Sequence, residues 1–201
     1  MKKKNVLVCG KGRWGKKVIL ILKKISNIVR ILDSKTDHKT INLSKIDWVF
    51  ILTPIESHFK LVNYFLTKKK NIFCEKPLCL SFKQATFLIK KARKNKCNLY
   101  ISDIEIYKKK KIQKKNNFNI VRKKLVRENN NEILYRLTYH DVYLLKNFLI
   151  PINKLKVTKN EKKFSLELMM KNANMQASFN YDIKSKLNKH KINNINFQKF
   201  V

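Results

Sequence analysis

The chain has 201 residues, of which 44% are hydrophobic and 10% aromatic. This is enough for one ordinary domain, or for one domain with a small second lobe, and it excludes a collagen, a coiled coil or a disulfide-stapled miniprotein. Lys and Arg number 47 against 13 Asp and Glu, a formal net charge of +34. Such an excess of positive charge is typical of proteins that bind nucleic acid or an anionic membrane.

The basic excess is almost entirely lysine, which weakens the case for a nucleic-acid partner. Only six basic residues are Arg, whereas Lys, Asn and Ile together supply 86 residues. These three amino acids have A- and T-rich codons, so the excess fits compositional drift of a genome. A surface that reads phosphates is expected to use more Arg, whose planar fork binds phosphate bidentately. We expect no specific nucleic-acid partner and keep a basic nucleic-acid-binding protein as an alternative.

Glycine is very scarce, and its only three positions lie within six residues. Gly10, Gly12 and Gly15 follow the apolar run 5–9 and precede the helical pattern of residues 16–28. The pattern G-x-G-x-x-G between a strand and a helix is typical of a turn that binds the pyrophosphate of a dinucleotide. The first glycine permits the tight turn, the second lets the pyrophosphate approach the backbone, and the third lets the helix pack on the strand.

Asp33 follows the second apolar run, residues 28–32, eighteen residues after Gly15. An acidic residue at this place accepts hydrogen bonds from the adenosine ribose and favours NAD over NADP, because it repels a 2′-phosphate. Ser34 and Lys35 beside it soften that preference. The alternative is a solvated aspartate at a strand end.

Further apolar runs alternate with helical patterns as far as residue 104. The runs are 48–52, 71–74 and 99–102, and the helical patterns are 58–67 and 81–94. Ser81 begins a capping-box pattern. This alternation of strands and helices predicts an NAD-binding Rossmann domain over 1–107, with a parallel sheet buried on both faces. Only 13 residues separate Asp33 from Asp47. Because this is about the minimum for one crossover, we expect a trimmed sheet.

Residues 108–201 predict a small α+β lobe. A strand-like segment at 118–127 is followed by a helix that starts near His140. Alternating segments then follow at 154–158, 163–170, 174–183 and 195–201. They predict an antiparallel sheet. The fold class expected for the whole chain is therefore α/β, a trimmed Rossmann parallel sheet followed by this lobe.

The cysteines form no C-x-x-C pair and have no histidine at metal-ligand spacing. They are Cys9, Cys74, Cys79 and Cys97. We expect reduced, mostly buried thiols and no metal. The apolar run after the lysine-rich start is too short for the core of a signal peptide, and no run is long enough to span a bilayer. We expect a cytoplasmic protein with no membrane partner.

Several motifs carry a family resemblance. They are GKGRWG at 10–15, WVFILTP at 48–54, Ser57-His58, NIFCEKPL at 71–78 and the pair His140-Asp141. This series resembles the glucose–fructose oxidoreductase, inositol dehydrogenase and MocA family of NAD(P)-dependent sugar oxidoreductases. It looks most like members that act on nucleotide-linked sugars in surface-polysaccharide synthesis. The EKP turn is the most specific element, and the resemblance is good over 4–107 and loose over 118–201.

The resemblance implies NAD as cofactor, with NADP less favoured, and a sugar or nucleotide-sugar substrate. It makes Lys76 the catalytic lysine and His140 a second acid/base residue, since hydride transfer from a carbinol needs groups that take or stabilise the hydroxyl proton. The residues implied at the cofactor are Gly10, Gly12, Arg13, Trp14, Gly15, Asp33, Thr53, Pro54, His58 and Glu75.

The sequence also departs from the family pattern. Arg136 stands where an aspartate is common, and Lys69 stands where glycine is expected, so that we expect the preceding helix to lack its left-handed cap. The substrate-binding lobe is abridged. A catalytically reduced NAD-binding or scaffold protein of the same fold is therefore an alternative to an active enzyme. A homodimer, if one forms, is expected to use the C-terminal sheet.

Overall fold

The computed structural model describes residues 2–103, 117–123, 138–144, 152–160, 163–170, 176–182, 189–192 and 195–196. The chain divides into two compact units, which we call the N-terminal domain (residues 1–103) and the C-terminal domain (residues 104–201). Within the described ranges, no helix is both long and apolar enough to cross a membrane.

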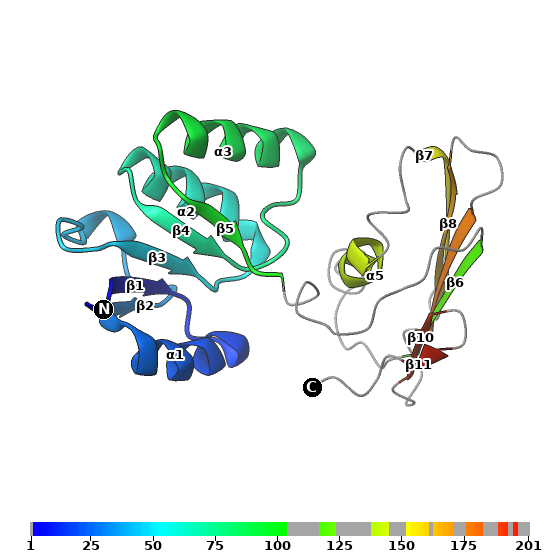
Figure 1. Ribbon diagram of the computed structural model, residues 1–201, viewed down its shortest axis with the longest axis horizontal. Helices are drawn as coiled ribbons and strands as arrows, with labels where there is room; N and C mark the ends of the chain where they lie inside the picture. The colour runs from blue at the N-terminus through cyan, green and yellow to red at the C-terminus, as the bar shows by residue number, and fades with distance from the viewer. Residues whose placement is uncertain are drawn as a thin grey trace. The chain divides into compact units, whose positions relative to one another are not determined.

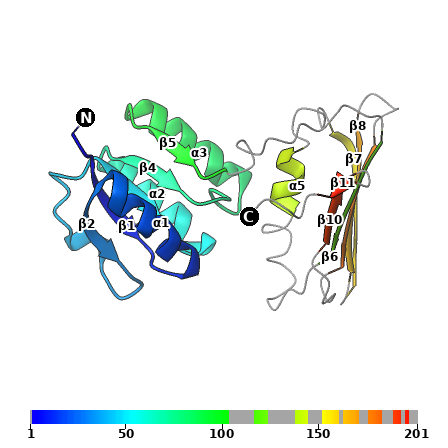
Figure 2. The ribbon, with the colours of Figure 1, turned by 60° about the horizontal axis from the view of Figure 1, so that its bottom comes forward.

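A five-stranded parallel sheet forms the centre of the N-terminal domain. Its strands are β1 (Asn5–Cys9), β2 (Asn27–Leu32), β3 (Trp48–Ile51), β4 (Asn71–Cys74) and β5 (Leu99–Ile101). They lie in the order β2-β1-β3-β4-β5, with β2 and β5 at the two edges (Figure 2). The chain leaves β1 toward β2 and then crosses back to β3 on the other side of β1. Open α/β sheets bind their ligands at such a reversal, outside the carboxyl ends of the strands.

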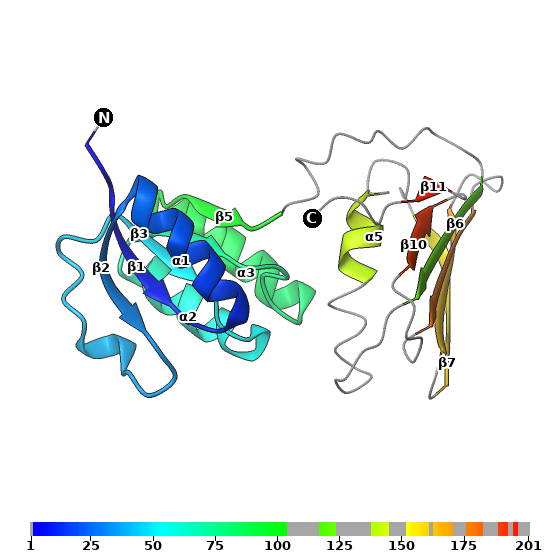
Figure 3. The same ribbon diagram turned by 90° about the horizontal axis from the view of Figure 1, so that it is seen from below.

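Helices cover both faces of this sheet. They are α1 (Arg13–Ile25), α2 (Ile55–Thr67) and α3 (Phe82–Lys94). Figures 1 and 3 show α1 on one face and α2 with α3 on the other. Val6 and Val8 of β1 pack in the cluster that includes α1, whereas Leu7 and Cys9 belong to the larger core under α2 and α3. Because alternate residues of β1 are buried on opposite faces, the strand reads as a continuous apolar run.

The expected trimming of the sheet is present at β2. The link from β2 to β3 contains only the 3₁₀ helix η1 (His38–Thr40) as regular structure, and the sheet ends at β2. As an edge strand, β2 leaves Val29 50% and Ile31 37% exposed. The prediction of strands buried on both faces is therefore wrong for β2, because no further strand and helix lie beyond it to cover it.

Helix boundaries differ from the sequence pattern where local chemistry outweighs periodicity. α1 ends at Ile25, before the expected residue 28, because β2 already begins at Asn27. α2 begins at Ile55, directly after Pro54, rather than at residue 58. Ser81 is the N-cap of α3, but its side chain makes no capping hydrogen bond, so the predicted capping box does not form.

Two lysines adopt the left-handed backbone conformation that usually selects glycine. Lys69 after α2 and Lys96 after α3 both have φ of +54°. At the end of α2 the Lys69 N–H donates to the Leu66 carbonyl and the Lys70 N–H to the Phe65 carbonyl, both at 3.0 Å. This is the hydrogen-bond pattern of a Schellman cap. The prediction that α2 lacks its left-handed cap is therefore wrong, because lysine adopts that conformation at a cost of about 1–2 kcal/mol.

The C-terminal domain contains one helix and a six-stranded sheet. The elements are β6 (Asn117–Lys123), α5 (Tyr139–Leu144), β7 (Ile152–Lys159), β8 (Lys163–Met170), β9 (Gln176–Asp182), β10 (Lys189–Ile192) and β11 (Ile195–Asn196). The strand order is β11-β10-β6-β9-β8-β7. All neighbours pair antiparallel except β6 and β9, which are parallel. The predicted α+β lobe is confirmed, but its sheet is mixed rather than purely antiparallel, because β6 inserts between two strands that come much later in the chain.

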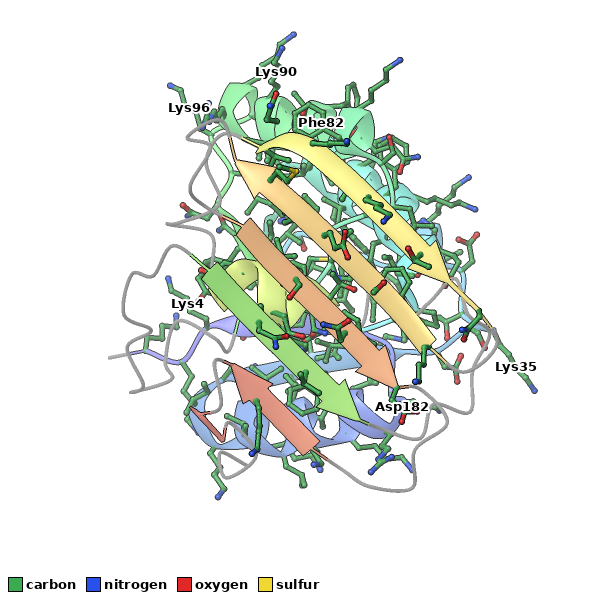
Figure 4. The ribbon with its side chains drawn as sticks, turned by 90° about the vertical axis from the view of Figure 1, so that its right-hand side faces the viewer. Lys4, Lys35, Phe82, Lys90, Lys96 and Asp182 are labelled. Carbon is green, nitrogen blue, oxygen red and sulfur yellow. The ribbon has the colours of Figure 1, made fainter. Side chains whose placement is uncertain are left out.

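One face of the second sheet is apolar and lies on the side of α5. Its buried side chains from β8 and β9 are Phe164, Leu166, Leu168, Ala177, Phe179 and Tyr181. The opposite face, shown in Figure 4, is polar. There Ser178 and Asn180 of β9 donate to Asn119 of β6 at 3.4 Å. This alternation of apolar and polar residues is what the sequence pattern of these segments predicts.

The two left-handed lysines give a test of the fold. We expect Lys69→Gly and Lys96→Gly each to raise the free energy of unfolding by about 1 kcal/mol, because glycine removes the strain of a positive φ. Lys68→Gly is the control, since Lys68 has φ of −82°. Urea unfolding followed by tryptophan fluorescence measures this, because Trp14 and Trp48 both lie in the N-terminal domain. Equal effects of glycine at residues 68, 69 and 96 would contradict the left-handed caps.

Candidate cofactor site

Three turns lie side by side at the carboxyl edge of the parallel sheet. We call them the glycine turn (residues 10–15), the proline turn (residues 53–54) and the lysine turn (residues 75–77). The Leu52 N–H donates to the Cys9 carbonyl at 2.8 Å, and the Glu75 N–H donates to the Ile51 carbonyl at 2.9 Å. These bonds extend the pairing of β1, β3 and β4 beyond the strand ends. The sheet therefore brings together the turns that the sequence motifs singled out.

Packing within the protein requires glycine at two positions of the glycine turn. Gly10 has φ of +103°, and a Cβ atom there would lie 2.7 Å from the Leu52 carbonyl oxygen. A Cβ atom on Gly15 would lie 2.6 Å from the Gly10 carbonyl oxygen. Since a side chain at either position would displace backbone atoms, both glycines are explained without any ligand.

Gly12 is not explained in that way. Within the described structure nothing lies within 4 Å of a Cβ atom built on it, and its φ of −64° is open to any residue. The chain uses lysine even where the backbone favours glycine, at Lys69 and Lys96. Gly12 is also the N-cap of α1, where it offers no side chain to the free N–H groups of the first turn. This bare helix end suits the close approach of a phosphate.

Asp33 lies at the end of β2, and both of its carboxylate oxygens are engaged. Oδ2 is 3.0 Å from the Lys11 ammonium of the glycine turn. Oδ1 accepts from the Lys35 N–H at 3.1 Å and from the Thr36 hydroxyl at 2.9 Å. The Lys11 contact, followed by those of Thr36 and Lys35, lowers the pKa of Asp33 to about 2. The carboxylate is therefore charged at any physiological pH.

Trp14 and Glu75 connect the glycine turn to the lysine turn. The Trp14 Nε1–H donates to Glu75 Oε1 at 2.6 Å, although the Trp14 side chain remains 45% exposed. The other Glu75 oxygen accepts from the Lys76 N–H at 3.3 Å. Lys76 itself is half-buried, and Arg13 is exposed at the first position of α1. The Glu75 carboxylate thus connects both turns. The spacing of Trp14 and Glu75 in the sequence does not indicate this contact.

His58 links the proline turn to the lysine turn. Its side chain is buried, with Nδ1 2.9 Å from the Pro77 carbonyl oxygen and Nε2 2.9 Å from the Thr53 carbonyl oxygen. A neutral imidazole donates to one of these oxygens, whereas an imidazolium donates to both. The Ser57 hydroxyl also donates to Thr53 Oγ1, at 2.6 Å. Pro54, between them, is the N-cap of α2, and the Lys76–Pro77 peptide bond is cis.

The other proposed catalytic residue lies in the C-terminal domain. His140 is half-buried on α5, next to the fully buried Asp141. The Tyr181 hydroxyl of β9 donates to Asp141 Oδ2 at 2.9 Å, which fixes α5 to the second sheet. The sequence indicated Tyr181 only as part of an alternating strand. Arg136, the departure from the family pattern, lies outside the described residues.

The four cysteines of the N-terminal domain form no disulfide. Cys9 and Cys74 are buried at the ends of β1 and β4, and Cys79 and Cys97 are partly buried. Burial raises the pKa of Cys9 to about 12 and also raises that of Cys74. The expected burial is therefore found for two of the four cysteines, and the other two are only partly buried. Within the described ranges, no group of three or more His, Cys, Asp or Glu residues is arranged to hold a metal ion.

Comparison with known proteins supports the family indicated by the motifs. Residues 24–102 match the model of the Gfo/Idh/MocA proteins, described as an oxidoreductase family with an NAD-binding Rossmann fold. The matched range begins after the glycine turn, so that turn is an independent observation. No curated protein sequence matches the chain.

Solved structures with the same fold cover most of the chain. UDP-N-acetylglucosamine 3-dehydrogenase GnnA from Acidithiobacillus ferrooxidans has a TM-score of 0.79 at 16% identity, over 96% of this chain and 74% of that one. GenD2 from gentamicin A biosynthesis, in complex with NAD, has a TM-score of 0.82 at 13% identity, over 96% of this chain and 69% of that one. A putative myo-inositol dehydrogenase from Sinorhizobium meliloti 1021 has a TM-score of 0.71 at 18% identity, over 94% of this chain and 72% of that one. The predicted fold class is confirmed.

The different reasons for Gly12 and Gly15 predict different effects of the same substitution. We expect Gly12→Ala to leave the urea unfolding midpoint unchanged but to weaken NADH binding at least about tenfold, because a methyl group obstructs the approach of the pyrophosphate. Gly15→Ala should lower stability by about 1–3 kcal/mol, because it overpacks α1 against the glycine turn. Titration calorimetry and urea unfolding measure the two effects. Unchanged NADH binding in Gly12→Ala would remove Gly12 from the cofactor site.

Proposed function

We propose that this chain oxidises or reduces a sugar hydroxyl. Its N-terminal domain matches the NAD-binding Rossmann domain of the Gfo/Idh/MocA oxidoreductase family, as the motifs predict. The observation that carries the proposal is the space at Gly12, a side-chain-free helix N-cap: apart from its chain neighbours, no described residue lies within 4 Å of a Cβ atom built on it. The likeness to a UDP-N-acetylglucosamine 3-dehydrogenase supports a nucleotide-linked sugar as the substrate class.

The residues around the glycine turn fit the cofactor in charge and shape. The free N–H groups of α1 face the pyrophosphate, and the charged Asp33 accepts from the ribose. The residues assigned to the cofactor are Gly10, Gly12, Arg13, Trp14, Gly15, Asp33, Thr53, Pro54, His58 and Glu75. His58 acts there by holding the proline turn against the lysine turn. When bound, NAD supplies the hydride acceptor or donor.

Lys76 and His140 are assigned to the substrate proton. In the direction of oxidation, the carbinol carbon loses a hydride while its hydroxyl loses a proton. The Lys76 ammonium stabilises the negative charge that develops on the oxygen, and His140 takes the proton, or returns it in the reverse direction. Three contacts fix the lysine turn for this task. They are the Glu75 bond to the Lys76 N–H, the Trp14 bond to Glu75 and the His58 bond to Pro77.

A screen of UDP-linked sugars with NAD, followed by the ultraviolet absorbance of NADH, tests the proposed reaction. With the best substrate, we expect Lys76→Met to lower turnover by about 10²–10⁴-fold, the usual contribution of a positioned acid or base, while NADH binding stays nearly intact. His140→Asn should lower turnover less, because water can replace one proton carrier. Lys83→Met, at an exposed position of α3, is the control and should retain full turnover.

The outcomes separate the proposal from its alternatives. Tight NADH binding without turnover on any sugar would favour a catalytically reduced or scaffold protein. Salt-sensitive binding of RNA or DNA that NADH does not alter, without NADH binding, would favour a nucleic-acid-binding protein. Unchanged turnover in Lys76→Met would remove the catalytic assignment of Lys76.

A further inference from the structure

Lys11 of the glycine turn already contacts the carboxylate that is expected to bind the ribose. Its ammonium lies 3.0 Å from Asp33 Oδ2, with the Lys11 side chain 60% exposed and the Asp33 side chain 34% exposed. The contact joins two loops that follow neighbouring strands, β1 and β2. An exposed pair of this kind contributes little to stability, so its consequence for ligand binding is the more informative one.

The hydrogen-bonding capacity of Asp33 is nearly used up. A carboxylate offers about four lone-pair sites. Lys11 takes one on Oδ2, and the Lys35 N–H and the Thr36 hydroxyl take two on Oδ1. Among the described residues one site therefore remains, whereas the two neighbouring hydroxyls of a ribose need two. Binding of both hydroxyls requires Lys11 to leave Oδ2.

The charge of the Lys11–Asp33 pair also bears on which cofactor the site accepts. An isolated aspartate at this place discriminates against NADP because it repels the 2′-phosphate. Here the Lys11 ammonium neutralises Asp33, whose pKa of about 2 keeps it charged and the pair intact near neutral pH. When Lys11 leaves Asp33, its ammonium is still beside the ribose, and an ammonium is a good point-charge partner for phosphate.

We propose that Lys11 makes the ribose subsite accept a 2′-phosphate, so that the protein binds NADP as well as NAD. The inference rests on the dinucleotide site of the proposed function and deepens it. It assigns cofactor choice to a residue of the glycine turn rather than to the loop after β2. With NAD bound, the two ribose hydroxyls replace Lys11 on Asp33, and the Lys11 ammonium moves into solvent. With NADP bound, it pairs with the 2′-phosphate.

Calorimetric titration of the full chain with NADH and with NADPH tests this. We expect the wild type to bind the two within about tenfold of each other. Lys11→Met should weaken NADPH binding about tenfold, because it removes a charge-assisted contact, and should leave NADH binding equal or tighter, because Asp33 is freed. The NADPH contact should also weaken as salt increases. Lys16→Met, an exposed lysine in the first turn of α1, is the matched control and should not change the ratio.

A second variant distinguishes Lys11 from its neighbour Lys35. Lys35→Met should change the ratio much less, because Lys35 binds Asp33 through its backbone N–H. A ratio that is unchanged in Lys11→Met, or that shifts only in Lys35→Met, overturns the inference while leaving the dinucleotide site in place. Failure of the wild type to bind either nucleotide overturns the proposed function itself.

Discussion

The close approach of α1 to the ends of two strands is the constraint on which the rest of the site depends. Gly15 packs against the Gly10 carbonyl, and Gly10 packs against the Leu52 carbonyl, at distances that leave no space for a Cβ atom. This contact sets the start of α1 directly over the point where the strand order reverses between β1 and β3. The free N–H groups of the helix therefore lie beside the ends of β1 and β3.

Polar contacts then attach the lysine turn to both of its neighbours. The buried ring of His58 connects it to the proline turn, and the Trp14 bond to Glu75 connects it to the glycine turn. The direction of Lys76 therefore depends on two side chains from different helices, α1 and α2. Carbonyl groups are costly to leave unpaired when buried, so the bonds of His58 to the Thr53 and Pro77 carbonyl oxygens give it a structural role in holding these turns together.

Sequence reasoning was accurate where one strong local signal determines the structure. Apolar runs found every strand of the N-terminal sheet, the short link after Asp33 predicted its trimmed edge, and the motifs indicated the family. It failed where tertiary contacts decide. The parallel pairing of β6 with β9 needs strands distant in the chain, and the short β10 (KHKI) has too few apolar residues to show a period. The bonds of His58 and Trp14 likewise depend on which turns the sheet makes adjacent.

The left-handed lysines show how composition misleads residue-by-residue comparison. Lys69 occupies a position where glycine is expected, yet the Schellman bonds are present, because the hydrogen bonds of the cap outweigh the strain of one residue. Lysine thus occupies two positions where the absence of glycine costs only strain. At Gly10 and Gly15, by contrast, a side chain would collide with backbone atoms.

Binding of NAD at the glycine turn can be tested by amide hydrogen exchange of the wild-type chain with and without saturating NADH. We expect slower exchange at residues 10–16 and 33–36 when NADH is present, because the bound pyrophosphate and ribose would shield these amides. Exchange in α3, on the other face of the sheet, should not change. Unchanged exchange across the glycine turn, or protection confined to other segments, would show that NADH does not bind there.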